Sequence, residues 1–220
     1  MTRIDYRLNA LVDAGLADLG PLAALAQAAA RNGATLIQYR DKTASTAAMI
    51  GQAKAIGEAL KDTGVPFVVN DRVDVALAAG ADGVHLGADD MDAQTARRLL
   101  GPRAIIGLTV KNATDADRAG RAPVDYACIG GVFETLSKTN PDPPVGIDGL
   151  RLLREQVRAL NPALPVGAIA GIDLSRIPSV IAAGADGVAA ISAIFRSRDM
   201  ARATAAFRAA VDAALEGRAA

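Results

Sequence analysis

The stretch Ala78-Ala79-Gly80-Ala81-Asp82-Gly83-Val84 occurs twice in this chain, the second time as Ala182-Ala183-Gly184-Ala185-Asp186-Gly187-Val188. Each copy follows a segment with helical periodicity and precedes an apolar run of strand length. The first glycine of each copy suits the positive φ that commonly ends a helix. Asn32-Gly33-Ala34 is a weaker third copy. The repeat therefore predicts joints at which a helix ends and a strand of an α/β fold begins.

Outward from these joints, apolar runs alternate with amphipathic helical segments along the chain. The expected strands are residues 8–12, 34–40, 65–69, 83–86, 104–108, 124–129, 166–169 and 186–191. The expected helices are residues 21–31, 45–61, 73–79, 92–100, 112–119, 148–160, 173–183 and 201–215. Eight such units predict an α/β fold, a single (β/α)8 TIM barrel over residues 1–220, with its active site at the carboxyl ends of the strands. A doubly wound open sheet is the alternative, but the chain lacks the G-x-G-x-x-G turn of a dinucleotide-binding version.

Composition and charge exclude several classes of function. Lys and Arg total 24, and Asp and Glu also total 24, so neither a basic nucleic-acid surface nor a polybasic membrane patch is expected. The single cysteine, Cys128, excludes an internal disulfide and a Cys-based zinc site, and its apolar neighbours indicate a buried, inert thiol. Charged residues near the amino terminus interrupt any signal peptide, and no segment suits a membrane span. We expect a cytoplasmic protein; the sequence leaves its oligomeric state open, a homo-oligomer included.

Polar side chains gather where the predicted strands end. In the second strand, Gln38-Tyr39-Arg40-Asp41-Lys42, alternation places Gln38 and Arg40 on one face, and Lys42 continues that face if the chain stays extended. In a barrel, the residues at and after the strand ends meet on one rim. The other residues expected on this rim are Asn70, Asp71, Asp89, Asp90, Thr109, Lys111, Thr135, Ser137, Lys138, Gly171 and Ser192.

This set of side chains predicts a site for phosphorylated ligands. Cations and hydroxyls suit phosphate oxygens. Carboxylates at the ends of the third and fourth strands suit Mg²⁺, which takes few protein carboxylates together with substrate phosphates. The loops around Gly171 and Ser192 follow the seventh and eighth strands, where barrels commonly bind a monophosphate. The alternative is that Gly171 is only a turn residue. We expect a polyphosphate with its metal on one side of the rim and a second phosphate on the other.

Six stretches, in order, resemble the motifs of the thiamine-phosphate synthase family, also called thiamine-phosphate pyrophosphorylase. Residues 38–42 resemble Q-x-R-x-K, and residues 70–71 resemble N-D. Residues 83–90 resemble G-V-H-L-G-Q-x-D, and residues 131–138 resemble G-P-V-F-x-T-x-T-K. Residues 168–172 resemble A-I-G-G-I, and residues 188–194 resemble V-A-V-I-S-A-I. The resemblance extends from the first strand to the eighth.

The resemblance implies a transferase of thiamine biosynthesis. Such an enzyme joins 4-amino-5-hydroxymethyl-2-methylpyrimidine diphosphate to a thiazole phosphate and releases pyrophosphate. The implied mechanism is dissociative, because the C–O bond breaks before the thiazole nitrogen attacks the pyrimidine cation. The residues implied for the diphosphate are Gln38, Arg40, Lys42, Asn70, Thr109 and Lys138, with Arg40, Lys42 and Lys138 catalytic. The residues implied for the thiazole phosphate are Thr135, Ser137, Gly171, Ile191 and Ser192, and those implied for Mg²⁺ are Asp71 and Asp90.

The chain departs from the family pattern at a few positions. Ala88 stands in place of glutamine, Gly131 and Glu134 in place of prolines, and Ala170 in place of a glycine. The change at residue 170 removes no hydrogen-bond donor but restricts φ in the loop. Thr109 and Ser137 replace a serine and a threonine and keep the hydroxyl.

Three other functions are consistent with parts of the pattern. A thiazole tautomerase-like paralogue would rely on a histidine after the fifth strand, where this chain has Lys111. A non-catalytic thiamine-precursor-binding protein or a sugar-phosphate isomerase would not need the acid pair. His85 lies inside a strand, so we interpret it as a packed, hydrogen-bonded core histidine rather than a catalytic base. The long loop 131–146 is expected to act as a mobile lid that orders on ligand binding.

Overall fold

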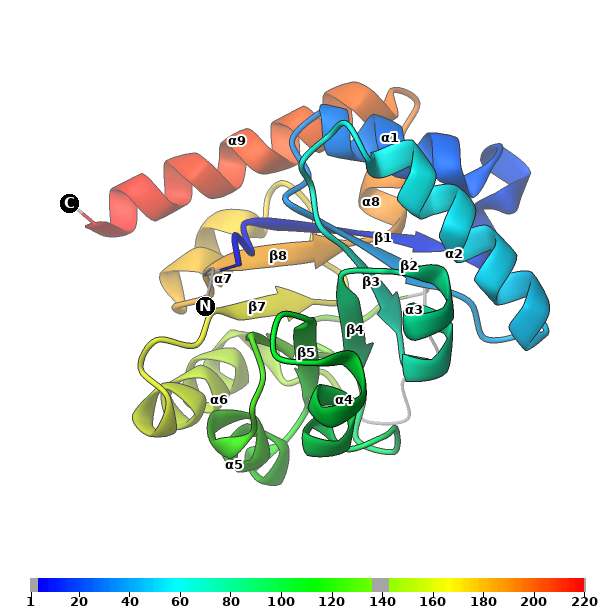
Figure 1. Cartoon of the computed structure of the whole chain (residues 1–220). Helices are drawn as coiled ribbons and strands as arrows, with labels where there is room; N and C mark the ends of the chain where they lie inside the picture. The colour runs from blue at the N-terminus through cyan, green and yellow to red at the C-terminus, as the bar shows by residue number, and fades with distance from the viewer. Residues whose placement is uncertain (1–3, 136–142, 220) are drawn as a thin grey trace.

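Eight parallel strands form a closed barrel in which β1 pairs with β2, each strand pairs with the next, and β8 pairs with β1 (Figure 1). This computed structural model describes residues 4–135 and 143–219. The strands are β1 Leu8–Asp13, β2 Leu36–Arg40, β3 Phe67–Asn70, β4 Gly83–Leu86, β5 Ile105–Val110, β6 Tyr126–Ile129, β7 Val166–Ile169 and β8 Gly187–Ala190. The predicted (β/α)8 barrel is confirmed.

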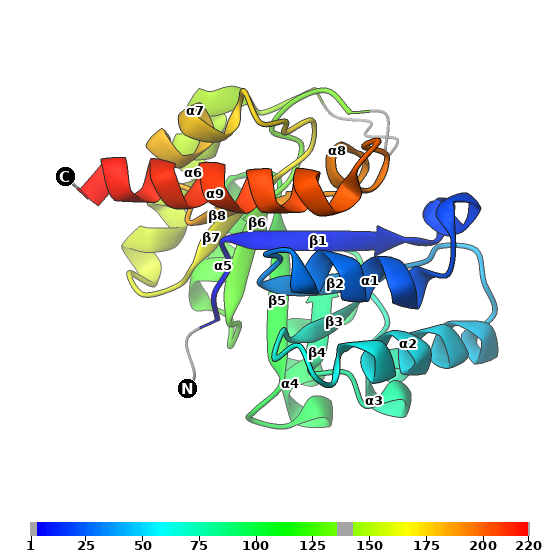
Figure 2. The ribbon, with the colours of Figure 1, turned by 90° about the horizontal axis from the view of Figure 1, so that it is seen from above.

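Helices surround the barrel, and α9 lies alongside α7 and α8 (Figure 2). The helices are η1 Ala14–Leu19, α1 Leu22–Arg31, α2 Thr46–Leu60, α3 Val73–Ala79, α4 Ala93–Leu100, α5 Ala113–Arg121, α6 Gly146–Leu160, α7 Ile177–Ala182, α8 Ser192–Phe195 and α9 Met200–Ala219. Ser45, Asp92 and Asn112 cap α2, α4 and α5 by accepting a hydrogen bond from the backbone three residues on. Within the described residues, no helix combines the length and the apolar composition needed to cross a bilayer.

Two short helices were not predicted and a third begins late, while other element boundaries shift by up to four residues. The 3-10 helix η1 and the short helix α8 were not expected, because six and four residues are too few to show helical periodicity. Helix α7 begins at Ile177 instead of residue 173. The carboxylate of Asp173 accepts hydrogen bonds from the backbone N–H groups of Ser175 and Arg176, and this turn occupies the residues before the helix.

The two copies of the repeat perform the same structural task. Gly80 ends α3 with φ of 70°, and Gly184 has φ of 106°. After each glycine, an aspartate binds the first N–H group of the preceding strand: Asp82 accepts from Phe67 at 2.8 Å, and Asp186 from Val166 at 2.9 Å. The repeat therefore ends a helix and also fixes the start of a neighbouring strand.

Two tyrosines fill the amino-terminal half of the barrel interior. The rings of Tyr6 and Tyr126 are 4.7 Å apart between centroids, and both side chains are buried. Two strand glycines make room for them. A Cβ atom at Gly167 would lie 1.7 Å from the Tyr6 ring, and one at Gly107 would lie 2.1 Å from the Tyr126 ring. The rings fill this end of the barrel interior, and the pocket inside the barrel opens toward the carboxyl ends of the strands.

Candidate active site

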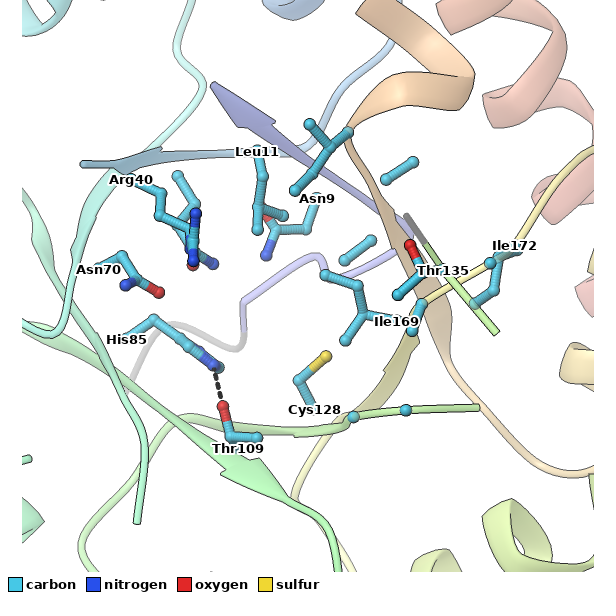
Figure 3. A pocket seen from close by; sticks show the side chains of 18 of the residues that line it. Asn9, Leu11, Arg40, Asn70, His85, Thr109, Cys128, Thr135, Ile169 and Ile172 are labelled. Carbon is cyan, nitrogen blue, oxygen red and sulfur yellow. Dashed lines mark hydrogen bonds between the residues drawn. The ribbon is translucent and has the colours of Figure 1, made fainter. Parts of the chain in front are cut away.

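A pocket opens at the carboxyl ends of the strands and receives side chains from all eight of them (Figure 3). Its volume is about 970 Å³ when the open mouth is included. The strand residues that line it are Asn9, Leu11, Gln38, Arg40, Asn70, His85, Thr109, Cys128, Ile169 and Ala189. The residues that follow strands and also line it are Lys111, Thr135, Gly171, Ile191 and Ser192, with a few small or apolar neighbours.

Strand β2 contributes a buried amide and a paired guanidinium to the pocket. Alternation points Gln38 and Arg40 inward, as predicted, and Gln38 is 2% exposed. Arg40 lies opposite Asp13 in the pairing of β1 with β2 and forms an ion pair with it. The pair positions a cation at one side of the pocket, next to Asn70 from β3.

Beside the pocket, Lys42 and two aspartates form one charged cluster. The ammonium group of Lys42, about half exposed, forms an ion pair with Asp71. Asp71 has φ of 63°, and its N–H donates to the carbonyl of His85 at 2.7 Å. The Asp90 carboxylate accepts a hydrogen bond from the Gly87 N–H at 2.6 Å, and Asp71 interacts with it strongly enough to raise its pKa. The cluster lies outside the pocket lining, because the chain turns away from the β2 direction before Lys42.

The electrostatics of the acid pair suit a divalent cation. Burial, followed by the interaction with Asp71, raises the pKa of Asp90 above its ordinary value. Among the described residues, no group of three or more His, Cys, Asp or Glu side chains is placed to hold a metal ion. A pair of carboxylates at the mouth of a phosphate site still fits Mg²⁺, which keeps several waters and takes further oxygens from substrate phosphates. The donor set therefore fits Mg²⁺.

His85 is buried and hydrogen-bonded, as the sequence predicted, but it also faces the pocket. Its Nδ1 lies 3.0 Å from the hydroxyl oxygen of Tyr126, and its Nε2 lies 2.9 Å from Oγ1 of Thr109. Thr109 was expected just after the fifth strand and instead lies within β5, which extends two residues further than predicted. These contacts fix the imidazole against the pocket wall.

On the opposite side, the loops after β6, β7 and β8 approach one another. The N–H groups of Val132 and Phe133 donate to the carbonyls of Ile169 and Ala170, both at 3.1 Å. A Cβ atom at Gly171 would lie 2.3 Å from the carbonyl oxygen of Glu134, so a close backbone approach does require glycine there. This contact brings Thr135 to the pocket beside Ile191 and Ser192.

Two of the predicted residues, Ser137 and Lys138, lie outside the described residues, as does the centre of the expected lid. Ala170 has φ of 93°, so the loop keeps a glycine-like backbone although the side chain is present. Asp89, which was expected on the rim, neither lines the pocket nor belongs to the charged cluster; every other described residue predicted for the site does one or the other.

Sequence reasoning missed Asn9, which is 1% exposed at the pocket floor. The signal was present, because alternation in β1 places Asn9 and Leu11 on one face. It also did not place Cys128 at the pocket. Burial raises the pKa of that thiol to about 12, so it stays protonated, in agreement with the expected inert cysteine.

Comparison with known proteins gives one consistent family. The family model described as thiamine monophosphate synthase matches residues 8–194. A thiamine-phosphate synthase from Agrobacterium fabrum is 69% identical over 218 residues, which is 99% of each chain. One from Chloroflexus aurantiacus is 42% identical over 213 residues, covering 97% of this chain and 96% of the relative. A solved thiamine phosphate pyrophosphorylase from Pyrococcus furiosus superposes with a TM-score of 0.85 at 34% identity, over 98% of this chain and 100% of the other. The chain therefore belongs to the thiamine monophosphate synthase family of transferases.

Proposed function

We propose that the chain joins 4-amino-5-hydroxymethyl-2-methylpyrimidine diphosphate to a thiazole phosphate, forming thiamine phosphate and pyrophosphate. Family membership supports this reaction, and one observation carries it to these residues. A single pocket has a guanidinium and two amides on its β2–β4 side, with Lys42 and an acid pair beside it, and hydroxyl and backbone donors on its β7–β8 side. Two phosphorylated substrates need two such sides.

The pyrimidine diphosphate belongs on the β2–β4 side. Arg40 and Asn70 line the pocket there, and Lys42 lies just beyond them. Cationic donors bind phosphate oxygens strongly and stabilise charge that develops on a departing pyrophosphate. Gln38, Thr109 and Lys138 complete the proposed set for this substrate, with Arg40, Lys42 and Lys138 stabilising the leaving group.

The thiazole phosphate belongs on the other side, at Thr135, Gly171, Ile191 and Ser192, with Ser137 joining them. Because the two phosphate groups take opposite sides, the reacting carbon and nitrogen meet between them. Because both reactants are held in one pocket, a bimolecular step becomes effectively unimolecular.

Asp71 and Asp90 would hold Mg²⁺. When bound, the ion supplies positive charge to the departing pyrophosphate. Lys42 is the ion-pair partner of Asp71 in this structure. Mg²⁺ bound at Asp71 would therefore share that carboxylate with the ammonium group of Lys42.

The interior of the pocket suits a reactive cation. Leu11, Cys128, Ile169 and Ala189 give it apolar walls that keep water away from the cation, which water would otherwise quench to the alcohol. A dissociative step needs no covalent nucleophile, and the thiol that faces the pocket is kept protonated by its high pKa.

Incubation of the purified protein with both substrates and Mg²⁺ tests the proposal, with thiamine phosphate and pyrophosphate measured by chromatography. Equal amounts of both products are expected, and none when either substrate is omitted. Isomerisation of the thiazole substrate without pyrophosphate release would support the tautomerase-like alternative instead. Binding of both precursors without conversion would support the non-catalytic alternative.

Two further expectations stay predictions: the cytoplasmic location and the assignment of residues 1–220 to one domain. The oligomeric state stays open, a homo-oligomer included.

A further inference from the structure

Asn9 carries an unsatisfied hydrogen-bond acceptor at the floor of the pocket. Its side chain is 1% exposed, and its Oδ1 atom is buried without a hydrogen-bond partner. Among the pocket-lining residues that the structure describes, Asn9 alone has such an atom. An unsatisfied buried acceptor costs free energy that a ligand donor can recover. Asn9 is therefore a candidate for direct contact with the substrate.

The orientation of the Asn9 amide follows from its neighbours below the pocket. Nδ2 of Asn9 donates to the hydroxyl oxygen of Tyr6 at 3.4 Å. Burial raises the pKa of the Tyr6 hydroxyl well above its ordinary value, so the hydroxyl stays protonated. Its oxygen accepts the hydrogen bond from Nδ2. Oδ1 is then the atom of Asn9 left for a ligand.

The surroundings of Asn9 suit the edge of a flat, mostly apolar ring. Leu11 lies on the same face of β1, Ala189 of β8 is the register partner of Asn9, and Ile169 and Cys128 also line the pocket (Figure 3). Because both phosphate groups are assigned to the rim, the pyrimidine ring is the part of the substrates that reaches inward. The exocyclic amino group of the pyrimidine is a hydrogen-bond donor. It could supply the partner that the acceptor Oδ1 of Asn9 lacks.

We propose that Asn9 is a specificity-determining residue whose Oδ1 accepts a hydrogen bond from the exocyclic amino group of the pyrimidine. This inference rests on the proposed function, and it deepens it by naming the group that selects an aminopyrimidine. A pocket with a buried acceptor discriminates strongly against an analogue that lacks the donor.

The test compares the pyrimidine diphosphate with its 4-deamino analogue, in which hydrogen replaces the amino group. Selectivity is the ratio of the two kcat/KM values, measured for the unaltered protein, Asn9→Leu and Asn9→Ala. Loss of the amino group also removes electron donation to the cation. That intrinsic effect is the same for every variant, so changes in the ratio report Asn9. Leu11→Ala is the matched control, because it alters the same strand and pocket without removing a polar group.

Both Asn9 variants should lose about tenfold in selectivity, mainly through slower use of the amino substrate. Leu11→Ala should slow both substrates and keep the ratio. A second measurement uses the unaltered protein alone: 4-amino-5-hydroxymethyl-2-methylpyrimidine monophosphate should inhibit at lower concentration than its 4-deamino analogue, by a similar factor.

An unchanged ratio in the folded Asn9 variants would overturn the proposal and leave Asn9 as a packing residue. If neither variant folds, equal inhibition of the unaltered protein by the two monophosphates would overturn it. Absence of thiamine phosphate with the natural substrates would instead contradict the proposed function itself, so the two failures are distinguishable.

Discussion

Asp71 and Asp90 follow different strands, β3 and β4, yet Asp71 is, after burial, the main cause of the raised pKa of Asp90. The Gly87 N–H holds Asp90 in place, and Lys42 pairs with Asp71. Two acids this close cannot both ionise without cost, and the pKa of Asp90 is raised accordingly, with burial as the larger cause. A divalent cation bound between them would relieve that cost, which links the pair to a metal-dependent reaction.

Activation by Mg²⁺ should therefore depend on pH. A raised pKa means that Asp90 holds its proton at a higher pH than an ordinary aspartate. Because the proton and the metal compete for the same carboxylate, the Mg²⁺ concentration for half-maximal activity should rise as pH falls through that pKa. Titrations of activity with Mg²⁺ at several pH values measure this. The phosphates of the substrates also titrate, so Mg²⁺ binding to the substrate alone is the control. The role of Asp90 would be contradicted if the Mg²⁺ concentration for half-maximal activity changed with pH only as much as Mg²⁺ binding to the substrate alone does.

Arg40→Ala should slow the reaction far more than it destabilises the fold. The guanidinium lines the pocket, and loss of one preorganised electrostatic partner costs on the order of 10²–10³ in rate. Arg121→Ala is the matched control, because that side chain is 66% exposed on α5 and, within the described part of the chain, forms an ion pair only with Asp117. Steady-state kinetics and thermal unfolding distinguish the two effects. Turnover at the unaltered rate, or simple unfolding of Arg40→Ala, would count against this role.

Ser192→Ala should separate the two phosphate sites. The hydroxyl lines the pocket at the start of α8, on the side away from Arg40. Its loss should weaken binding of the thiazole phosphate by about 0.5–1.5 kcal/mol, while binding of the pyrimidine diphosphate hardly changes. Calorimetry with each substrate measures the two affinities. Equal losses for both substrates would show that the assignment of the sites is wrong.

Ala170→Gly should stabilise the protein. Ala170 has φ of 93°, a conformation in which a Cβ atom is strained and glycine is not. Glycine also has more conformational freedom in the unfolded chain, which costs free energy on folding. The free energy gained by relieving the strain is larger than that cost, so the free energy of unfolding should rise by about 1 kcal/mol. Ala55→Gly, at an exposed position inside α2, is the control and should lower it by about 1 kcal/mol. Urea unfolding measures both. If Ala170→Gly lowered the free energy of unfolding as much as Ala55→Gly does, the strain argument would be refuted.

Most of the barrel could be predicted because its signals are local. Glycine joints, apolar runs and capping residues such as Ser45 and Asn112 act within a few residues of the elements that they end or begin. The side chains at the strand ends could be predicted as well, because closure of a barrel brings all those ends to one rim.

What the sequence could not show depends on contacts between distant strands. Asn9 carries no motif, and its place at the pocket floor depends on barrel closure, which brings it together with residues such as Cys128 of β6. The ion pair of Arg40 with Asp13 depends on the register of β1 with β2. Lys42 was expected to continue the face of β2, but it turns toward Asp71, and only the positions of the two loops determine that contact.

The most direct test of the central claim, that this pocket drives a metal-assisted departure of pyrophosphate, is product formation from both substrates with and without free Mg²⁺. Thiamine phosphate and pyrophosphate should form in equal amounts with Mg²⁺. No product should form in excess EDTA, and activity should recover when Mg²⁺ is restored. Undiminished turnover in EDTA would contradict the role of Asp71 and Asp90, and absence of product under both conditions would contradict the proposed reaction.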